Sequence, residues 1–130
     1  MGSWKTPENR KYLKTDEWLL LEGDTATIGI SDYAQDQLND IVFVELPSVG
    51  TAFAAGDVIG VVESVKAASD IATPVAGTVI EVNQVLEGKP ETINSDPYEK
   101  GWIVKLKVSD DSGADSLMDA AAYSAYNDGR

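Results

Sequence analysis

The chain has 130 residues, a formal net charge of -12 at pH 7, and neither cysteine nor histidine. This length suits a single domain with a modest core, and the sequence has no apolar run approaching the roughly 20 residues that a membrane-spanning helix needs. The composition excludes disulfides, a thiolate nucleophile and a histidine base or metal ligand, while the negative charge argues against nucleic acid and anionic membranes as partners.

The first part of the chain predicts short strands interrupted by one helix. Side chains that favour strands, bounded by turn residues, cluster at residues 17–21, 25–30 and 41–46. Residues 31–38 break this pattern, because Ser31 is a good helix cap and Ala34 and Leu38 lie one helical turn apart. Asn39 suits the end of such a helix. We therefore expect a short helix between the second and third strands.

The middle of the chain predicts a β-hairpin. Apolar runs at residues 58–65 and 67–74 flank Lys66 closely enough to pair, which places the lysine at the hairpin tip. The side chains expected on the inward face are Ile59, Val61 and Ile71.

The last part of the chain predicts two more strands and two helical segments. The strands are expected at residues 78–82 and 102–108. In the second strand, Trp102 and the apolar residues at every second position after it alternate with Ile103, Lys105 and Lys107. One face is therefore expected to be buried and the other, with Ile103, exposed to solvent. A short helical turn is expected at residues 90–93. A closing helix is expected at residues 111–125, because three apolar side chains fall at four-residue spacing: Leu117, Ala121 and Ala125.

Lys66 is the feature that points most directly to a function. It is the only basic residue between Glu45 and Lys89, and its neighbours include the small side chains of Ser64 and Ala67. A lysine at a tight hairpin tip projects away from the fold, so a modifying enzyme can surround it. We therefore interpret Lys66 as an attachment point. One alternative is an edge lysine that discourages aggregation, and another is an imine-forming nucleophile, which a chain without histidine disfavours.

Several segments resemble one family in order and spacing. Residues 62–67 (VESVKA) followed by residues 72–79 (ATPVAGTV) are similar to the attachment hairpin of lipoyl carrier domains. Four further segments resemble the H protein of the glycine cleavage system: residues 12–18 (YLKTDEW), 28–35 (IGISDYAQ), 42–47 (VFVELP) and 94–102 (NSDPYEKGW). A biotin carrier normally has methionine on both sides of its lysine, where this chain has Val65 and Ala67. The resemblance extends over residues 11–126.

The resemblance implies a mainly β fold. The expected architecture is a barrel-sandwich hybrid, a flattened β-sandwich like that of lipoyl domains, with a short helix near residues 31–38 and a C-terminal helix. Residues 1–10 are then an N-terminal extension, and residues 11–130 form a single lipoyl-carrier domain that includes the C-terminal helix. We expect a monomer in the bacterial cytoplasm, or in the mitochondrial matrix if a transit peptide has been removed.

The resemblance also implies a carrier and not an enzyme. Lipoate joined to Lys66 through an amide would supply the sulfur chemistry that a cysteine-free chain lacks. The arm would take an aminomethyl group of glycine from a pyridoxal-phosphate glycine decarboxylase to a tetrahydrofolate-dependent aminomethyltransferase, and dihydrolipoyl dehydrogenase would reoxidise it. A lipoate ligase, or an octanoyl or lipoyl transferase, would load the arm. The alternative is an H-like protein that serves as a lipoyl donor or regulatory scaffold for lipoate metabolism.

Two sets of site residues follow from the resemblance. Carboxylates and a hydroxyl are expected to line a groove that holds the aminomethyl cargo, because its amine should be protonated: Glu17, Asp70 and Thr15. The residues expected to guide the lipoylating enzyme are Glu63, Ser64 and Ala67. The alternative for the two groove acids is that both are merely solvated.

One position departs from the family pattern. Asp16 stands where the family usually has a histidine, which adds negative charge beside the expected groove. The departure leaves Lys66 untouched, and the sequence predicts no metal site.

Overall fold

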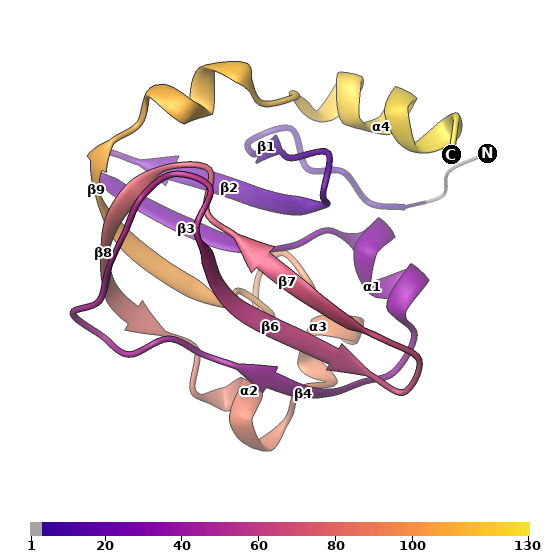
Figure 1. The fold of residues 1–130 in the computed structure, drawn as a ribbon. Coiled ribbons are helices and arrows are strands. Elements are labelled where there is room, and N and C mark those ends of the chain that lie inside the picture. The colour runs from indigo at the N-terminus through magenta and orange to yellow at the C-terminus, as the bar shows by residue number, and fades with distance from the viewer. Residues whose placement is uncertain (1–3) are drawn as a thin grey trace.

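Two antiparallel sheets form the body of the protein in the computed structural model, which describes residues 4–130 (Figure 1). The larger sheet has six strands in the order β1-β2-β3-β9-β8-β5, and the smaller has three in the order β4-β6-β7. Both are open sheets. The strands are β1 (Lys11–Tyr12), β2 (Glu17–Glu22), β3 (Thr25–Ile30), β4 (Ile41–Glu45), β5 (Ala52–Phe53), β6 (Val58–Ser64), β7 (Ala68–Ala72), β8 (Ala76–Val82) and β9 (Val104–Asp110).

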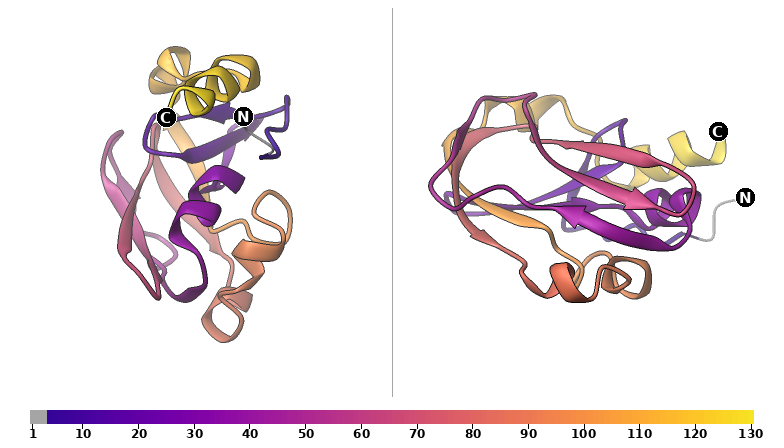
Figure 2. Two further views of the ribbon diagram at one scale, coloured as in Figure 1. Left: turned by 90° about the vertical axis from the view of Figure 1, so that its right-hand side faces the viewer. Right: turned by 60° about the horizontal axis from the view of Figure 1, so that its bottom comes forward.

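Helices are short and lie around the sheets (Figures 1 and 2). They are α1 (Asp32–Leu38), α2 (Val85–Gly88), α3 (Thr92–Ser95), the 3-10 helix η1 (Ser112–Ser116) and α4 (Ala120–Asp128). The predicted helix at residues 31–38 is confirmed in its details. The Ser31 hydroxyl accepts the Ala34 N–H at 3.1 Å, and Asn39 ends the helix with a φ of 64°. Together with the two sheets, these helices confirm the mainly β sandwich expected from the sequence.

The main core fills the space between the two sheets. Aliphatic side chains dominate it, as the alternation of the strands predicts. Its most buried members include Ile28, Val62, Ile71, Ile93 and Leu106.

A second, aromatic cluster covers the outer side of the larger sheet near β1 and β2. Tyr12, Trp18, Tyr98 and Tyr123 are its large members, and α4 supplies the last of them. Trp18 lies against Gly29, where an added Cβ atom would stand 2.7 Å from the indole ring. The sequence of β3 therefore leaves room for Trp18 by placing glycine opposite it. Figure 2 shows α4 running along this end of the sheet.

The segment before β1 packs against the domain. Trp4 lies edge-on to Tyr33 with 4.8 Å between the ring centroids, and the Tyr98 hydroxyl donates to the Lys5 carbonyl at 2.6 Å. Arg10 is buried, with its guanidinium 4.6 Å from the centroid of the Trp18 ring. These contacts concern residues 4–10 of the predicted extension, and its residues 1–3 lie outside the described part of the chain.

Two predictions about strand faces are wrong. Val62, and not Val61, is buried in β6, because the register against β7 shifts between Val58 and Gly60 and reverses the alternation beyond that point. Ile103 is fully buried where a wet position was expected. It precedes the start of β9, and its N–H donates to the Ile28 carbonyl at 2.9 Å.

The prediction of one continuous C-terminal helix is also wrong. η1 ends at Ser116, and a separate α4 begins after Asp119, whose carboxylate accepts the Ala122 N–H at 2.8 Å. The buried side of α4 carries Ala120, Tyr123 and Asn127, while Ala121 and Ala125 are exposed. Leu117 lies between the two helices and packs against the core, so it does not share a helix face with Ala121 and Ala125.

Within residues 4–130, no helix combines the length and the apolar character needed to cross a bilayer.

Candidate functional site

The β6–β7 hairpin turn is organised by Ser64. The Ser64 N–H donates to the Ala67 carbonyl at 2.8 Å, and the Ser64 hydroxyl accepts the N–H groups of Lys66 and Ala67 at 3.2 and 3.1 Å. The Val65 N–H is held by the Asp40 carbonyl at 3.1 Å, which ties the turn to the loop after α1. Hydrogen bonds between residues close in sequence therefore hold the backbone of the turn, and the small side chains of Ser64 and Ala67 are compatible with it.

Lys66 lies at the apex of this turn, between an exposed Val65 and an exposed Ala67. Its own side chain is exposed, and no ion pair or side-chain hydrogen bond engages its ammonium group within residues 4–130. The amine is thus presented to solvent by a rigid backbone. This arrangement suits modification by another enzyme.

Glu17 lies at the start of β2 and is buried, with 2% of its surface exposed. One carboxylate oxygen accepts the Thr15 hydroxyl at 2.5 Å, and the other accepts the Ala72 N–H of β7 at 2.7 Å. Burial raises the pKa of the Glu17 carboxyl, although the hydrogen bonds from Ala72 and Thr15 oppose that shift. Glu17 therefore connects the two sheets through a carboxylate that is costly to ionise.

The structure brings Thr15 and Glu17 together. Asp70 lies on β7, the strand whose Ala72 N–H contacts Glu17. Asp70 is exposed and lies two residues before Ala72, so strand alternation puts these two side chains on the same face of β7. No hydrogen bond among the described residues joins Asp70 to Thr15 or Glu17.

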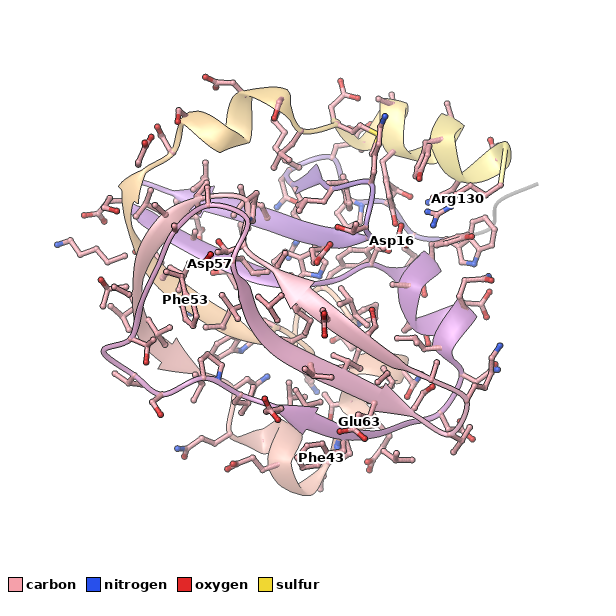
Figure 3. All side chains as sticks on the ribbon, in the orientation of Figure 1. Asp16, Phe43, Phe53, Asp57, Glu63 and Arg130 are labelled. Carbon is pink, nitrogen blue, oxygen red and sulfur yellow. The ribbon has the colours of Figure 1, made fainter. Side chains whose placement is uncertain are left out.

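Glu63 is exposed at the end of β6 and lies opposite Ala68 on one side and Phe43 of β4 on the other. Phe43 is itself 50% exposed. Figure 3 shows both side chains on the three-stranded sheet, toward the end that carries the turn. An acidic and an aromatic group therefore lie together on the surface that leads to Lys66.

A groove of about 240 Å³ lies next to Thr15. Its walls are two segments that are far apart in the sequence, and the lining residues are Tyr12, Leu13, Lys14, Thr15, Ser116, Leu117 and Met118. The two walls are joined by hydrogen bonds between Tyr12 and Met118, at 2.8 and 3.0 Å. No pattern in the sequence predicts that the segment before α4 forms one side of this groove.

Asp16 is surrounded by residues that sequence reasoning missed. Its carboxylate accepts the Tyr123 hydroxyl at 2.7 Å and forms an ion pair with Arg130 at 2.6 Å. The negative charge that departs from the family pattern is therefore matched by a cation. Among residues 4–130, no group of three or more acidic side chains is arranged to hold a metal ion.

Comparison with known proteins gives a consistent result. Residues 10–129 match the family described as glycine cleavage H-protein. A glycine cleavage system H protein of Bacteroides thetaiotaomicron is 50% identical over 123 residues, covering 95% of this chain and 98% of that protein. One of Thermus thermophilus is 56% identical over 117 residues, covering 90% of this chain and 91% of that protein. The crystal structure of a glycine cleavage system H protein from Mycobacterium marinum superimposes with a TM-score of 0.86 at 35% identity, covering 94% and 98% of the two chains.

Proposed function

The chain belongs to the glycine cleavage H-protein family, the lipoyl carriers of the glycine cleavage system, and on this premise we propose that Lys66 is its lipoyl attachment site. The single observation that supports the assignment is the exposed amine of Lys66 at the apex of a turn fixed by Ser64. The chain is a carrier subunit, and the chemistry belongs to the enzymes it visits.

The residues around Lys66 fit a lipoyl group. An amide requires a free amine, and the Lys66 ammonium has no competing partner within residues 4–130. The flanking Ala67 leaves room for an enzyme to reach it, and Ser64 keeps the turn in one conformation. Lipoate supplies a disulfide that can be reduced and can carry a one-carbon group, which a chain without cysteine cannot do itself. Glu63, Ser64 and Ala67 are proposed to guide the lipoylating enzyme.

Glu17, Thr15 and Asp70 are proposed to hold the cargo of the arm. A buried carboxylate without a cationic partner is electrostatically costly, and no lysine or arginine among the described residues forms an ion pair with Glu17. A protonated aminomethyl group would supply that missing charge. Thr15 is exposed and covers one Glu17 oxygen, so a cargo that arrives from solvent meets the hydroxyl first.

Tethering explains why such a carrier needs no active site of its own. An attached cargo remains at a high effective concentration near each enzyme that the carrier visits, so a reactive one-carbon group need not diffuse freely. The proposed partners are a pyridoxal-phosphate glycine decarboxylase, a tetrahydrofolate-dependent aminomethyltransferase, dihydrolipoyl dehydrogenase and a lipoate ligase or octanoyl or lipoyl transferase. We place the protein in the cytoplasm as a monomer.

Reconstitution of the glycine reaction tests this proposal. The lipoylated protein is mixed with the decarboxylase, and exchange of labelled carbon dioxide into glycine is measured. Wild-type protein and the Lys89→Arg control, which changes another exposed lysine, should support exchange, whereas Lys66→Arg should support none. If lipoylated wild-type protein supports no exchange, the shuttle assignment fails and the scaffold alternative takes its place.

A further inference from the structure

We propose that Asp16, Tyr123 and Arg130 form a C-terminal clasp that positions the Thr15–Glu17 pair for cargo binding. The inference rests on the proposed function of Glu17, and it adds residues that no sequence pattern assigned to the site. Asp16 acts here through its neighbours and is a positioning residue.

The backbone at Asp16 is held in an unfavourable conformation. Its φ is 82°, in the left-handed region that side chains other than glycine rarely adopt. Such a conformation persists only where the surroundings enforce it. The Asp16 N–H donates to the Leu13 carbonyl at 2.9 Å, and its carbonyl accepts the Ser31 N–H at 2.9 Å. The turn therefore directs the two residues on either side of Asp16, Thr15 and Glu17, toward each other.

The side chain of Asp16 is held from the far end of the chain. Arg130 donates to both carboxylate oxygens, at 2.6 and 3.0 Å, and Tyr123 donates to one of them at 2.7 Å. Figure 3 shows Asp16 and Arg130 facing each other beside the C-terminal helix. The Arg130 guanidinium lies over the rings of Tyr33 and Tyr126, 4.1 and 4.7 Å from their centroids. Hydrogen bonds to both oxygens orient the Asp16 carboxylate and also compensate its negative charge.

The same C-terminal segment contacts the Tyr12–Asp16 region at more than one point. Met118, in the segment before α4, pairs with Tyr12, and the Tyr126 hydroxyl donates to the Lys14 carbonyl at 3.4 Å. The groove of about 240 Å³ lies between these two segments, and Thr15 is part of its wall. The clasp therefore holds the wall that carries the cargo-facing hydroxyl.

The clasp also resolves the charge problem that Asp16 creates. Burial is the main cause of the raised pKa of Glu17, and repulsion from the neighbouring Asp16 carboxylate adds to it. The guanidinium of Arg130 lies against the Asp16 carboxylate and limits its repulsion of Glu17. Position 130 thus compensates for the acid at position 16.

Three variants of the unlipoylated protein separate backbone from charge. Asp16→Gly accepts a positive φ and removes the carboxylate, Asp16→Asn keeps the shape of the side chain and removes its charge, and Arg130→Gln removes the cation. Lys107→Gln is the matched control, because it breaks an exposed ion pair with Asp24 (3.6 Å) on a distant hairpin. The readouts are deuterium exchange of the Ala72 amide and NMR titration of the Glu17 carboxyl.

We expect the Ala72 amide to exchange about tenfold faster in Asp16→Gly and Arg130→Gln, because loosening one hydrogen bond to a charged group changes an equilibrium by roughly that factor. The Glu17 titration should move to higher pH in Arg130→Gln, and to lower pH in Asp16→Asn, which removes the repulsion and keeps the shape of the side chain. Lys107→Gln should change neither readout. Faster exchange spread equally over amides of the core strands, or an unchanged Ala72 amide and Glu17 titration, would overturn the inference.

A final comparison separates this inference from the proposed function. The variants are fully lipoylated and loaded with the aminomethyl cargo, and the release of ammonia and formaldehyde is followed over time. Faster release from Asp16→Gly than from wild-type protein supports the clasp, and an equal rate contradicts it. If wild-type protein takes up no cargo, the proposed function fails, while the Ala72 and Glu17 readouts still decide whether the clasp exists.

Discussion

The β6–β7 hairpin and the start of β2 each carry a glutamate, but the two side chains lie in opposite environments. Glu63 and Lys66 lie at an exposed apex that a few neighbouring residues organise. Glu17 is buried at the start of β2, where its carboxylate is held by Ala72, 55 residues later. The exposed apex is held by local contacts, whereas the buried carboxylate depends on a distant part of the chain. Ionising the exposed Glu63 therefore requires little desolvation, whereas ionising the buried Glu17 is opposed by desolvation.

Replacing the two glutamates by leucine gives the largest expected difference between these regions. Glu17→Leu leaves the Ala72 N–H and the Thr15 hydroxyl without their acceptor, and it should lower the free energy of unfolding by about 2 to 3 kcal/mol. Glu63→Leu changes an exposed side chain and should alter it by less than about 0.5 kcal/mol. Urea unfolding measures both, and equal losses would contradict the distinction.

The pH dependence of stability sharpens the comparison at Glu17. Burial raises the pKa of this carboxyl above its ordinary value of 4.5, so the folded chain binds its proton more tightly than the unfolded chain does. The stabilisation from this proton is complete below about pH 4.5 and is lost as the pH rises through the folded-state pKa.

Glu17→Gln removes that ionisation and should therefore gain stability relative to wild-type protein as the pH rises from 4.5 to neutrality. Urea unfolding of both proteins across this range checks the sign. A difference that stays constant with pH would show that burial does not perturb Glu17.

Asp70 tests how far the proposed cargo site reaches across β7. Asp70→Asn should leave lipoylation of Lys66 intact, because the turn is held by Ser64 and Asp40. It should shorten the lifetime of the aminomethylated protein by about threefold to tenfold, as expected for the loss of one charge-assisted contact. Asp24→Asn, at an exposed ion pair far along the sheet, is the control. A lifetime equal to that of the control would remove Asp70 from the site.

Sequence reasoning succeeded where the determinants are close together. The Ser31 cap, the Asn39 helix end and the position of Lys66 at a turn all depend on residues within one or two turns of the chain. Propensity and spacing are sufficient for such features.

It failed where distant contacts decide. The register shift in β6 that buries Val62 arises against β7 and cannot be read from alternation alone. The C-terminal clasp joins Asp16 to residues 107 and 114 positions away, and nothing local to Tyr123 or Arg130 marks them. The sequence left open whether Glu17 lines a groove or is solvated, because the Ala72 N–H that its buried carboxylate accepts lies 55 residues away.

Mass spectrometry of the protein after incubation with a lipoate ligase and lipoate tests the central assignment most directly. The account predicts one added lipoyl group, located by peptide mapping on Lys66, and no addition to Lys66→Arg under the same conditions. A protein that stays unmodified, or that carries the group on another lysine, would contradict the claim that the β6–β7 apex presents the attachment site.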